Sequence, residues 1–165
     1  MSKSTYISGS KLPYLGKNYD LKIMLSDYQN SILFTNNEFQ VTVTRKKPSK
    51  KAIEEIYQNW LLESARKLFQ NKTKKLAKKL SISQPKIIIK NLKNKWGSIT
   101  ANNIVTLNQN LAKAPSDVID YVILHELCHV KIKEHDHHFW NYVKKFMPNY
   151  HDKVRWLELH SKQIV

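Results

Sequence analysis

Apolar side chains occupy every second position in two stretches of the N-terminal part of the chain, residues 18–26 and 38–44. A period of two is typical of strands that bury one face. Residues 31–34 form a third short apolar run, and the Asn-Asn pair that follows it favours a tight hairpin turn. We therefore expect residues 1–45 to form an antiparallel β meander.

The next segment changes to a helical period. Its apolar residues are spaced by three and four positions: Ile53, Ile56, Tyr57, Trp60, Leu61 and Leu68. This spacing predicts a long amphipathic helix after residue 49, and Gln70 and Asn71 mark the point where the helix could break. The lysines that follow are expected on its solvated face: Lys72, Lys74, Lys75, Lys78 and Lys79.

A small mixed sheet is predicted after this helix. Residues 86–90 are a short β-branched run that follows a proline, as in a buried strand. Residues 96–100 and 104–108 flank an Ala-Asn-Asn insert, which indicates a hairpin.

All seven histidines lie in the last quarter of the chain, and the first of them falls within a predicted helix. Residues 115–117, Pro-Ser-Asp, are a helix-start signal. The apolar residues behind them recur at steps of four, four and three: Ile119, Ile123, Leu127 and Val130. We expect this helix to run to about Lys133, with His125 and His129 on a stripe beside the apolar one.

Residues 125–129 read His-Glu-Leu-Cys-His, which is an HExxH motif in a helical context. Residues four apart stand one turn above each other, so the imidazoles of His125 and His129 can reach one metal ion. Glu126 is rotated by about 100° around the helix, where its carboxylate can take a proton from a metal-activated water without binding the metal. The motif therefore predicts a catalytic zinc site.

A catalytic zinc site needs a third protein ligand. We expect His135, because it follows the end of the helical pattern and the chain can turn back there toward the metal. Asp136 would then cap a helix that stops before Pro148. The alternatives for the third ligand are His137, His138 and Glu158 from the last helix.

Composition limits where such a protein works. Cys128 is the sole cysteine, which excludes an intramolecular disulfide, and no apolar run reaches the ~18 residues of a membrane span. We therefore expect a cytoplasmic protein. The chain has 28 Lys and Arg against 13 Asp and Glu, a net charge of +15. Such a charge either favours an anionic partner or reflects a compositional bias without function.

On these residues the chain resembles the YgjP-like zinc metallopeptidases, small metal-dependent hydrolases of the zincin type. The similarity runs through a series of short motifs: Trp96-Gly97-Ser98, His125-Glu126-Leu127-Cys128-His129, Glu134-His135, Phe139-Trp140 and Arg155-Trp156-Leu157. The resemblance implies zinc bound by His125, His129 and His135, with Glu126 as the catalytic acid/base.

The predicted fold is α+β, a single zincin-like domain over residues 1–165. Its β-rich part is residues 1–45, and residues 49–165 form a helical and sheet part that carries the metal site. The elements expected along the chain are an antiparallel β meander, a long helix, a small mixed sheet, the HExxH helix and two C-terminal helices.

The predicted function is a zinc-dependent hydrolase, a metallopeptidase with one Zn²⁺ per chain and Glu126 as general base. One alternative is a nucleotide phosphohydrolase of the pyrophosphatase type, but glycines occur only at 9, 16 and 97 and supply no phosphate-binding loop. Another is a nucleic-acid-associated protease, since the SprT-type proteases share the zincin helix and the basic surface would recruit it. The expected partners are a peptide or a nucleotide, with weak nucleic-acid association through the basic surface and no membrane.

Overall fold

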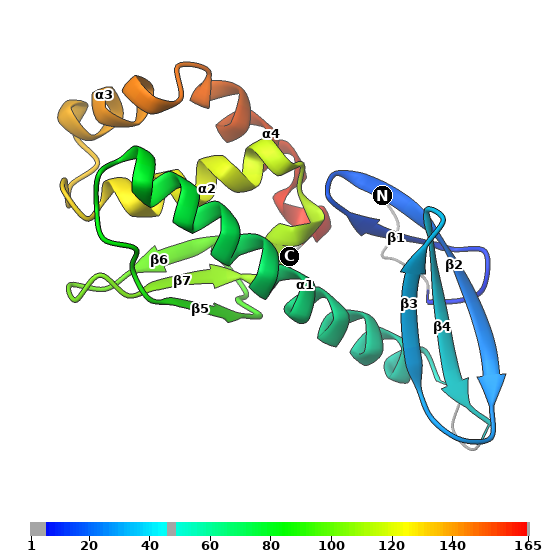
Figure 1. Ribbon diagram of the computed structural model, residues 1–165. Coiled ribbons are helices and arrows are strands. Elements are labelled where there is room, and N and C mark those ends of the chain that lie inside the picture. The colour runs from blue at the N-terminus through cyan, green and yellow to red at the C-terminus, as the bar shows by residue number, and fades with distance from the viewer. Residues whose placement is uncertain (1–5, 46–48, 165) are drawn as a thin grey trace.

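The computed structural model describes residues 6–45 and 49–164, and its α+β architecture confirms the predicted fold class (Figure 1). A four-stranded sheet stands at one end of the long helix α1 (Lys50–Lys79). A three-stranded sheet and the remaining helices lie along its other half. None of the helices in the described part of the chain combines the length and apolarity of a membrane span.

The N-terminal sheet departs from the predicted meander. It contains β1 (Lys11–Tyr14), β2 (Lys17–Ser26), β3 (Ser31–Thr35) and β4 (Glu38–Thr44), in the spatial order β1-β2-β4-β3. The pairs β1/β2 and β3/β4 are antiparallel, but β2 and β4 are parallel neighbours. The prediction of a wholly antiparallel meander is therefore wrong.

The burial of β4 explains this order. Phe39, Val41 and Val43 of β4 are at most 1% exposed. Ile32 and Phe34, which pair with Val41 and Phe39 from β3, are only half-buried. A central strand is covered from both sides, so the more buried β4 lies inside the sheet and β3 takes the edge. Alternation shows that each segment is a strand, but it does not show which strands become neighbours.

The turn between β1 and β2 attaches this sheet to the rest of the molecule. Leu15 and Gly16 both have positive φ, 48° and 82°. Their N–H groups donate to the carbonyls of Ala112 and Lys113 at 2.9 and 2.8 Å. A Cβ on Gly16 would lie 2.9 Å from Cγ of Pro115, so both the close approach and the backbone conformation require glycine.

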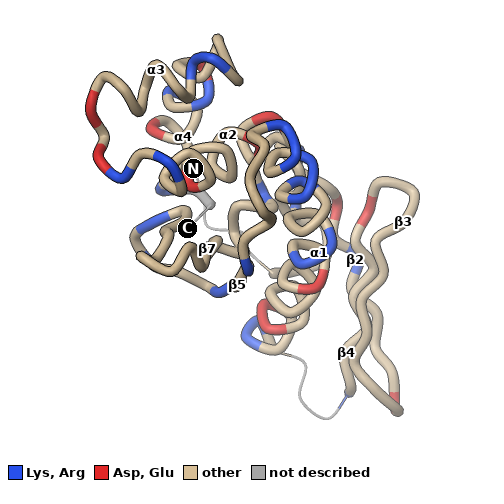
Figure 2. The backbone as a smooth tube through the Cα atoms, turned by 60° about the vertical axis from the view of Figure 1, so that its left-hand side comes forward, with Lys and Arg blue, Asp and Glu red and all other residues tan. Residues whose placement is uncertain are grey.

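Helix α1 runs without a break through Gln70 and Asn71. Its buried residues recur every four positions: Ile53, Tyr57, Leu61, Ala65, Phe69, Thr73 and Ala77. Ser49 caps the N-terminus by accepting a hydrogen bond from the N–H of Ala52 at 3.1 Å. Basic residues gather toward the C-terminal half of α1 (Figure 2), and Lys74, Lys75, Lys78 and Lys79 are exposed there, as predicted.

Aromatic rings join α1 to the N-terminal sheet. The ring of Trp60 on α1 meets those of Tyr14 and Phe39 edge-on, each at a centroid distance of 4.8 Å. Phe34 of the edge strand lies 5.8 Å from Trp60 in the same cluster. Edge-to-face pairs at such distances add to the free energy of burial, so this cluster couples the sheet to the helix.

The second sheet is mixed, as predicted. It contains β5 (Ile87–Lys90), β6 (Gly97–Ile99) and β7 (Val105–Asn108), in the order β5-β7-β6. Strand β7 is central, parallel to β5 and antiparallel to β6. Strand β6 therefore lies at one edge of this sheet, and its Gly97 lies close to Glu126 of the HExxH motif.

Four helical segments complete the chain. The short 3-10 helix η1 (Gln109–Lys113) leads into α2 (Ser116–Cys128), and α3 (His137–Phe146) and α4 (Tyr150–Ile164) follow. The last two confirm the predicted pair of C-terminal helices.

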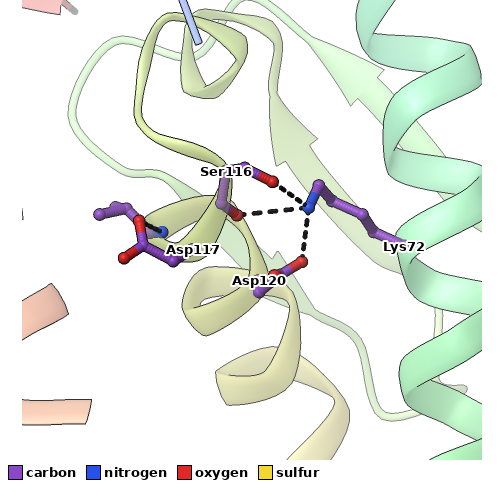
Figure 3. A network of polar contacts seen from close by, with 5 residues as sticks. Lys72, Ser116, Asp117 and Asp120 are labelled. Carbon is purple, nitrogen blue, oxygen red and sulfur yellow. Dashed lines mark hydrogen bonds and ion pairs between the residues drawn. The ribbon is translucent and has the colours of Figure 1, made fainter. Parts of the chain in front are cut away.

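Helix α2 is held at its N-terminal end by charged contacts. The ammonium of Lys72 on α1 donates to Asp120 Oδ1 at 2.7 Å and to Ser116 Oγ at 2.6 Å (Figure 3). Lys153 of α4 pairs with Asp117 at 2.9 Å. Lys72 is thus an exception to the solvated lysine face, because it fixes α2 against α1.

Candidate metal centre

The HExxH motif lies at the C-terminal end of α2, and this helix is shorter than predicted. It ends at Cys128 with His129 as its C-cap, about one turn before the expected end near Lys133. The N–H groups of Val130 and Ile132 donate back to the carbonyls of Leu127 and Cys128, which closes the end of the helix in turns. The early end lets the following loop bring its own side chains back to the motif.

Three imidazoles converge at this point. His135 Nε2 lies 3.1 Å from His125 Nε2 and 2.9 Å from His129 Nε2. One potential ligand atom from each histidine lies within 4.8 Å of the others. His135 comes from the loop before α3, whose N-terminus is capped by Asp136, as predicted, through a 3.1 Å hydrogen bond from the N–H of Phe139.

The far nitrogens of two of these rings have partners of their own. His129 Nδ1 lies 2.9 Å from the carbonyl oxygen of Ile132, and His125 Nδ1 lies 3.4 Å from the Tyr121 hydroxyl. A carbonyl can only accept, so Nδ1 of His129 carries the proton and its Nε2 lone pair faces the cluster. Such partners set the tautomer and the orientation of metal-binding histidines.

The ring of Phe139 packs against all three imidazole rings. Phe139 is fully buried, and its ring stacks on His129 at 4.4 Å and meets His125 and His135 at 5.0 and 5.1 Å. Trp140 stacks on His135 at 6.1 Å. Helix α3, which follows His135, therefore holds the three imidazole rings in place, in addition to the loop that carries His135.

Burial keeps the first two imidazoles neutral. It lowers the pKa of His125 to about 4, with a further contribution from the nearby His129 and His135. Burial also lowers the pKa of His129, although the hydrogen bond to Ile132 opposes it. Neutral imidazoles offer a nitrogen lone pair at neutral pH, as metal ligation requires.

Glu126 lies next to this cluster on the buried side of α2. It is 7% exposed, and burial raises the pKa of its carboxyl to about 7, an effect that the positive charge of Lys95 opposes. A Cβ built on Gly97 of β6 would lie 3.3 Å from Cγ of Glu126. The carboxyl group thus sits between α2 and the edge strand, with a pKa in the range suited to proton transfer.

The other ligand candidates lie elsewhere. His137 and His138 are exposed in the first turn of α3, with their rings 3.9 Å apart, and Glu158 is exposed on α4. Among the described residues, the grouping with metal-ligand geometry contains His125, His129 and His135. Cys128 is fully buried, and burial raises its pKa to about 12, which agrees with its interpretation as a core residue.

Sequence reasoning missed the supporting residues. Tyr121 stands one turn before His125 on the same helical stripe, and this spacing is the signal that could have found it. Lys95 gave no such signal, because its approach to Glu126 depends on the position of β6.

The residues present fit a divalent metal ion. Three imidazoles and an open fourth position are a common donor set for catalytic zinc. Nitrogens at 2.0–2.1 Å from a tetrahedral ion are about 3.4 Å apart. The separations of 3.1 and 2.9 Å need only a small expansion to reach that geometry.

Comparison with known proteins gives one family and several similar solved structures, among them two metallopeptidase zymogens. The model of the family described as "YgjP-like, metallopeptidase domain" matches residues 1–160. The metallopeptidase zymogen jannalysin of Methanocaldococcus jannaschii is 26% identical, with 58% of this chain and 89% of that chain covered and a TM-score of 0.48. The zymogen abylysin of Pyrococcus abyssi is 23% identical, with 56% and 92% covered and a TM-score of 0.49. No curated protein matches the chain.

Proposed function

Because the chain belongs to the YgjP-like metallopeptidase family, we propose that it is a zinc peptidase in which Glu126 is the general base. Family membership makes it a metal-dependent hydrolase that acts on peptides. The proposal adds the metal, its ligands and the base. The observation that carries it is the convergence of three imidazole nitrogens beside a buried carboxyl group.

We assign His125, His129 and His135 as the ligands of one Zn²⁺ per chain. Zinc, when bound, polarises a peptide carbonyl and lowers the pKa of a water molecule toward 7. The contribution of the protein is to hold the imidazoles neutral and in place through Tyr121, the Ile132 carbonyl and the ring of Phe139.

Glu126 is the proton carrier in this scheme. Its carboxylate takes the proton of the attacking water and later delivers it to the leaving amine. Burial favours the protonated form after the first step, and the charge of Lys95 favours the ionised form before it. The surroundings of Glu126 therefore favour neither the carboxylate nor the carboxylic acid strongly, as a residue that gains and loses a proton in each cycle requires.

The substrate backbone is proposed to bind along β6. An extended peptide can add to a free strand edge, and the edge nearest to Glu126 belongs to β6. Residues 104–108, the other arm of the predicted hairpin, do not supply this edge, because they include β7, the central strand.

A paired substitution tests the role of Glu126. Glu126→Gln should retain zinc and lose at least about 100-fold in turnover, because the amide keeps the size of the side chain and cannot accept the proton. Glu158→Gln, an exposed change on α4, should retain both. Zinc content and peptide hydrolysis are measured on the same preparations; near-normal turnover in Glu126→Gln would remove this residue from the mechanism.

A substrate panel tests the reaction class. Unfolded proteins and peptides should be hydrolysed, and nucleoside triphosphates should not. Hydrolysis of the triphosphates alone would support the nucleotide phosphohydrolase instead. Binding to DNA that weakens steeply with salt would support the nucleic-acid-associated protease.

A further inference from the structure

A basic depression lies beside the edge strand, and Lys95 is the one residue of its lining that the proposed mechanism uses. It has a volume of about 430 Å³, and it is lined by the loop before β6 and the last turns of α4: Lys93, Asn94, Lys95, Trp96, Ser161 and Lys162. No acidic side chain is among the residues that line it. The three lysines also form no ion pair within the part of the chain that the structure describes.

Hydrogen bonds fix the shape of this depression. Asn108 is fully buried, and its side-chain amide donates to the carbonyls of Leu92 and Lys95, each at 3.0 Å. The indole N–H of Trp96 donates to Ser161 Oγ at 3.2 Å, which ties the loop to α4. A ligand would therefore meet an ordered loop and would not have to order it on binding.

The depression adjoins the catalytic centre. Trp96 directly precedes Gly97 of β6. A Cβ built on Gly97 would lie 3.3 Å from Cγ of Glu126. A strand advances about 3.3 Å per residue, so a peptide paired with β6 would present to Lys95 and Trp96 a residue within about two positions of the cleaved bond.

We propose that this depression is a specificity pocket for a carboxylate of the peptide substrate, carried by an Asp or Glu side chain or by the C-terminus of the peptide. The assignment rests on the proposed peptidase function. The ammonium groups provide the attraction, and Trp96 in the lining provides apolar contact for the carbon atoms next to the carboxylate.

Binding of labelled peptides tests the pocket without turnover. The zinc-loaded Glu126→Gln protein is titrated with one peptide series that carries Asp, Asn or Lys near its C-terminus, each with a free or an amidated end. The readout is fluorescence anisotropy. The acidic or free-acid peptides should bind about tenfold more tightly than the neutral amides, since an exposed ion pair changes affinity by up to about fivefold and three lysines contribute.

A matched pair of triple variants tests the residues. Lys93→Gln, Lys95→Gln and Lys162→Gln together should abolish this preference. Lys74→Gln, Lys75→Gln and Lys78→Gln remove the same charge from the exposed face of α1 and should keep it. A preference that is absent from the parent protein, or that survives in the first triple variant, would overturn the pocket.

Turnover separates this proposal from the one on which it rests. If peptides are cleaved with no preference for a carboxylate, the pocket fails and the peptidase stands. If no peptide is cleaved but the carboxylate preference depends on the three lysines, the binding site stands and the peptidase fails. Asp compared with a free C-terminus tells which carboxylate the pocket takes.

Discussion

At the scale of single residues, the partners behind the histidines decide how well the imidazoles are placed. The Tyr121 hydroxyl lies 3.4 Å from Nδ1 of His125, on the side away from the cluster. Tyr121→Phe removes this partner and leaves the ring. Because such partners change metal affinity by about 10–100-fold, we expect the variant to bind zinc at least about tenfold more weakly.

Competition with a chromophoric chelator measures this affinity. Tyr28→Phe is the control, since Tyr28 is 91% exposed and lies in the N-terminal sheet region. Equal zinc affinity in Tyr121→Phe and the parent protein would mean that the hydroxyl has no part in orienting His125.

Lys113 gives a pH dependence of stability. Burial lowers its pKa to about 8, although the charge of Glu54 opposes the shift. Below pH 8 both the folded and the unfolded chain carry the proton, and the folded state bears the cost of the buried charge. Between pH 8 and the unfolded value of 10.5 the unfolded chain holds more protons, so stability should rise with pH.

Urea unfolding at pH 7 and pH 9.5 checks this slope. The parent protein should gain about 1–2 kcal/mol relative to Lys113→Met over that interval, since each pH unit is worth up to about 1.4 kcal/mol. Lys113→Met lacks the titrating ammonium group. The difference in free energy of unfolding between the two proteins therefore excludes the contribution of other groups that titrate at alkaline pH, such as the tyrosines. A constant difference between the two proteins would show that Lys113 keeps an ordinary pKa.

At the scale of elements, one lysine adds an ion pair to the packing of α1 against α2. The side chain of Lys72 is 14% exposed and that of Asp120 36% exposed, so water screens their ion pair only in part. Lys72→Met should lower the free energy of unfolding by about 1–2 kcal/mol, because Asp120 and Ser116 lose a charged donor.

The neighbouring Lys75 provides the matched substitution. It is exposed on the same helix, so Lys75→Met should change the free energy of unfolding by less than about 0.5 kcal/mol. Both values come from urea unfolding. Equal effects of the two variants would show that the Lys72 network does not hold α2.

Local pattern predicted the type of most elements, but it did not predict their neighbours. The long helix, the mixed sheet and the last two helices follow from apolar period and turn residues. Strand β1 was missed, and β4 was misplaced, because burial in a sheet depends on contacts that are distant in sequence. The same limit applies to the end of α2, where the loop to His135 replaces the last predicted turn.

The site was more predictable than the sheet. Glu126 and the pair of motif histidines have a fixed geometry once a helix is given, and the structure brings His135 within 3.1 Å of both motif histidines. Tyr121 could have been found from its spacing, one turn before His125 on the same helix. Phe139 and Lys95 act through the tertiary structure, so their part could not be derived from the motif.

At the scale of the whole molecule, we predict that residues 1–165 unfold as one domain. The aromatic cluster of Trp60, Tyr14 and Phe39 couples the N-terminal sheet to α1, and α1 also packs against α2. Circular dichroism at 222 nm and tryptophan fluorescence should therefore report one coincident unfolding transition. Two separated transitions would divide the chain into independent units.

The zinc content of two histidine variants tests the central claim most directly. Each protein is loaded with zinc, passed over a desalting column and analysed for metal. The parent protein and His138→Ala should hold about one zinc ion per chain, since His138 lies outside the cluster, and His135→Ala should lose most of it. Full zinc in His135→Ala together with loss in His138→Ala would contradict the assigned centre.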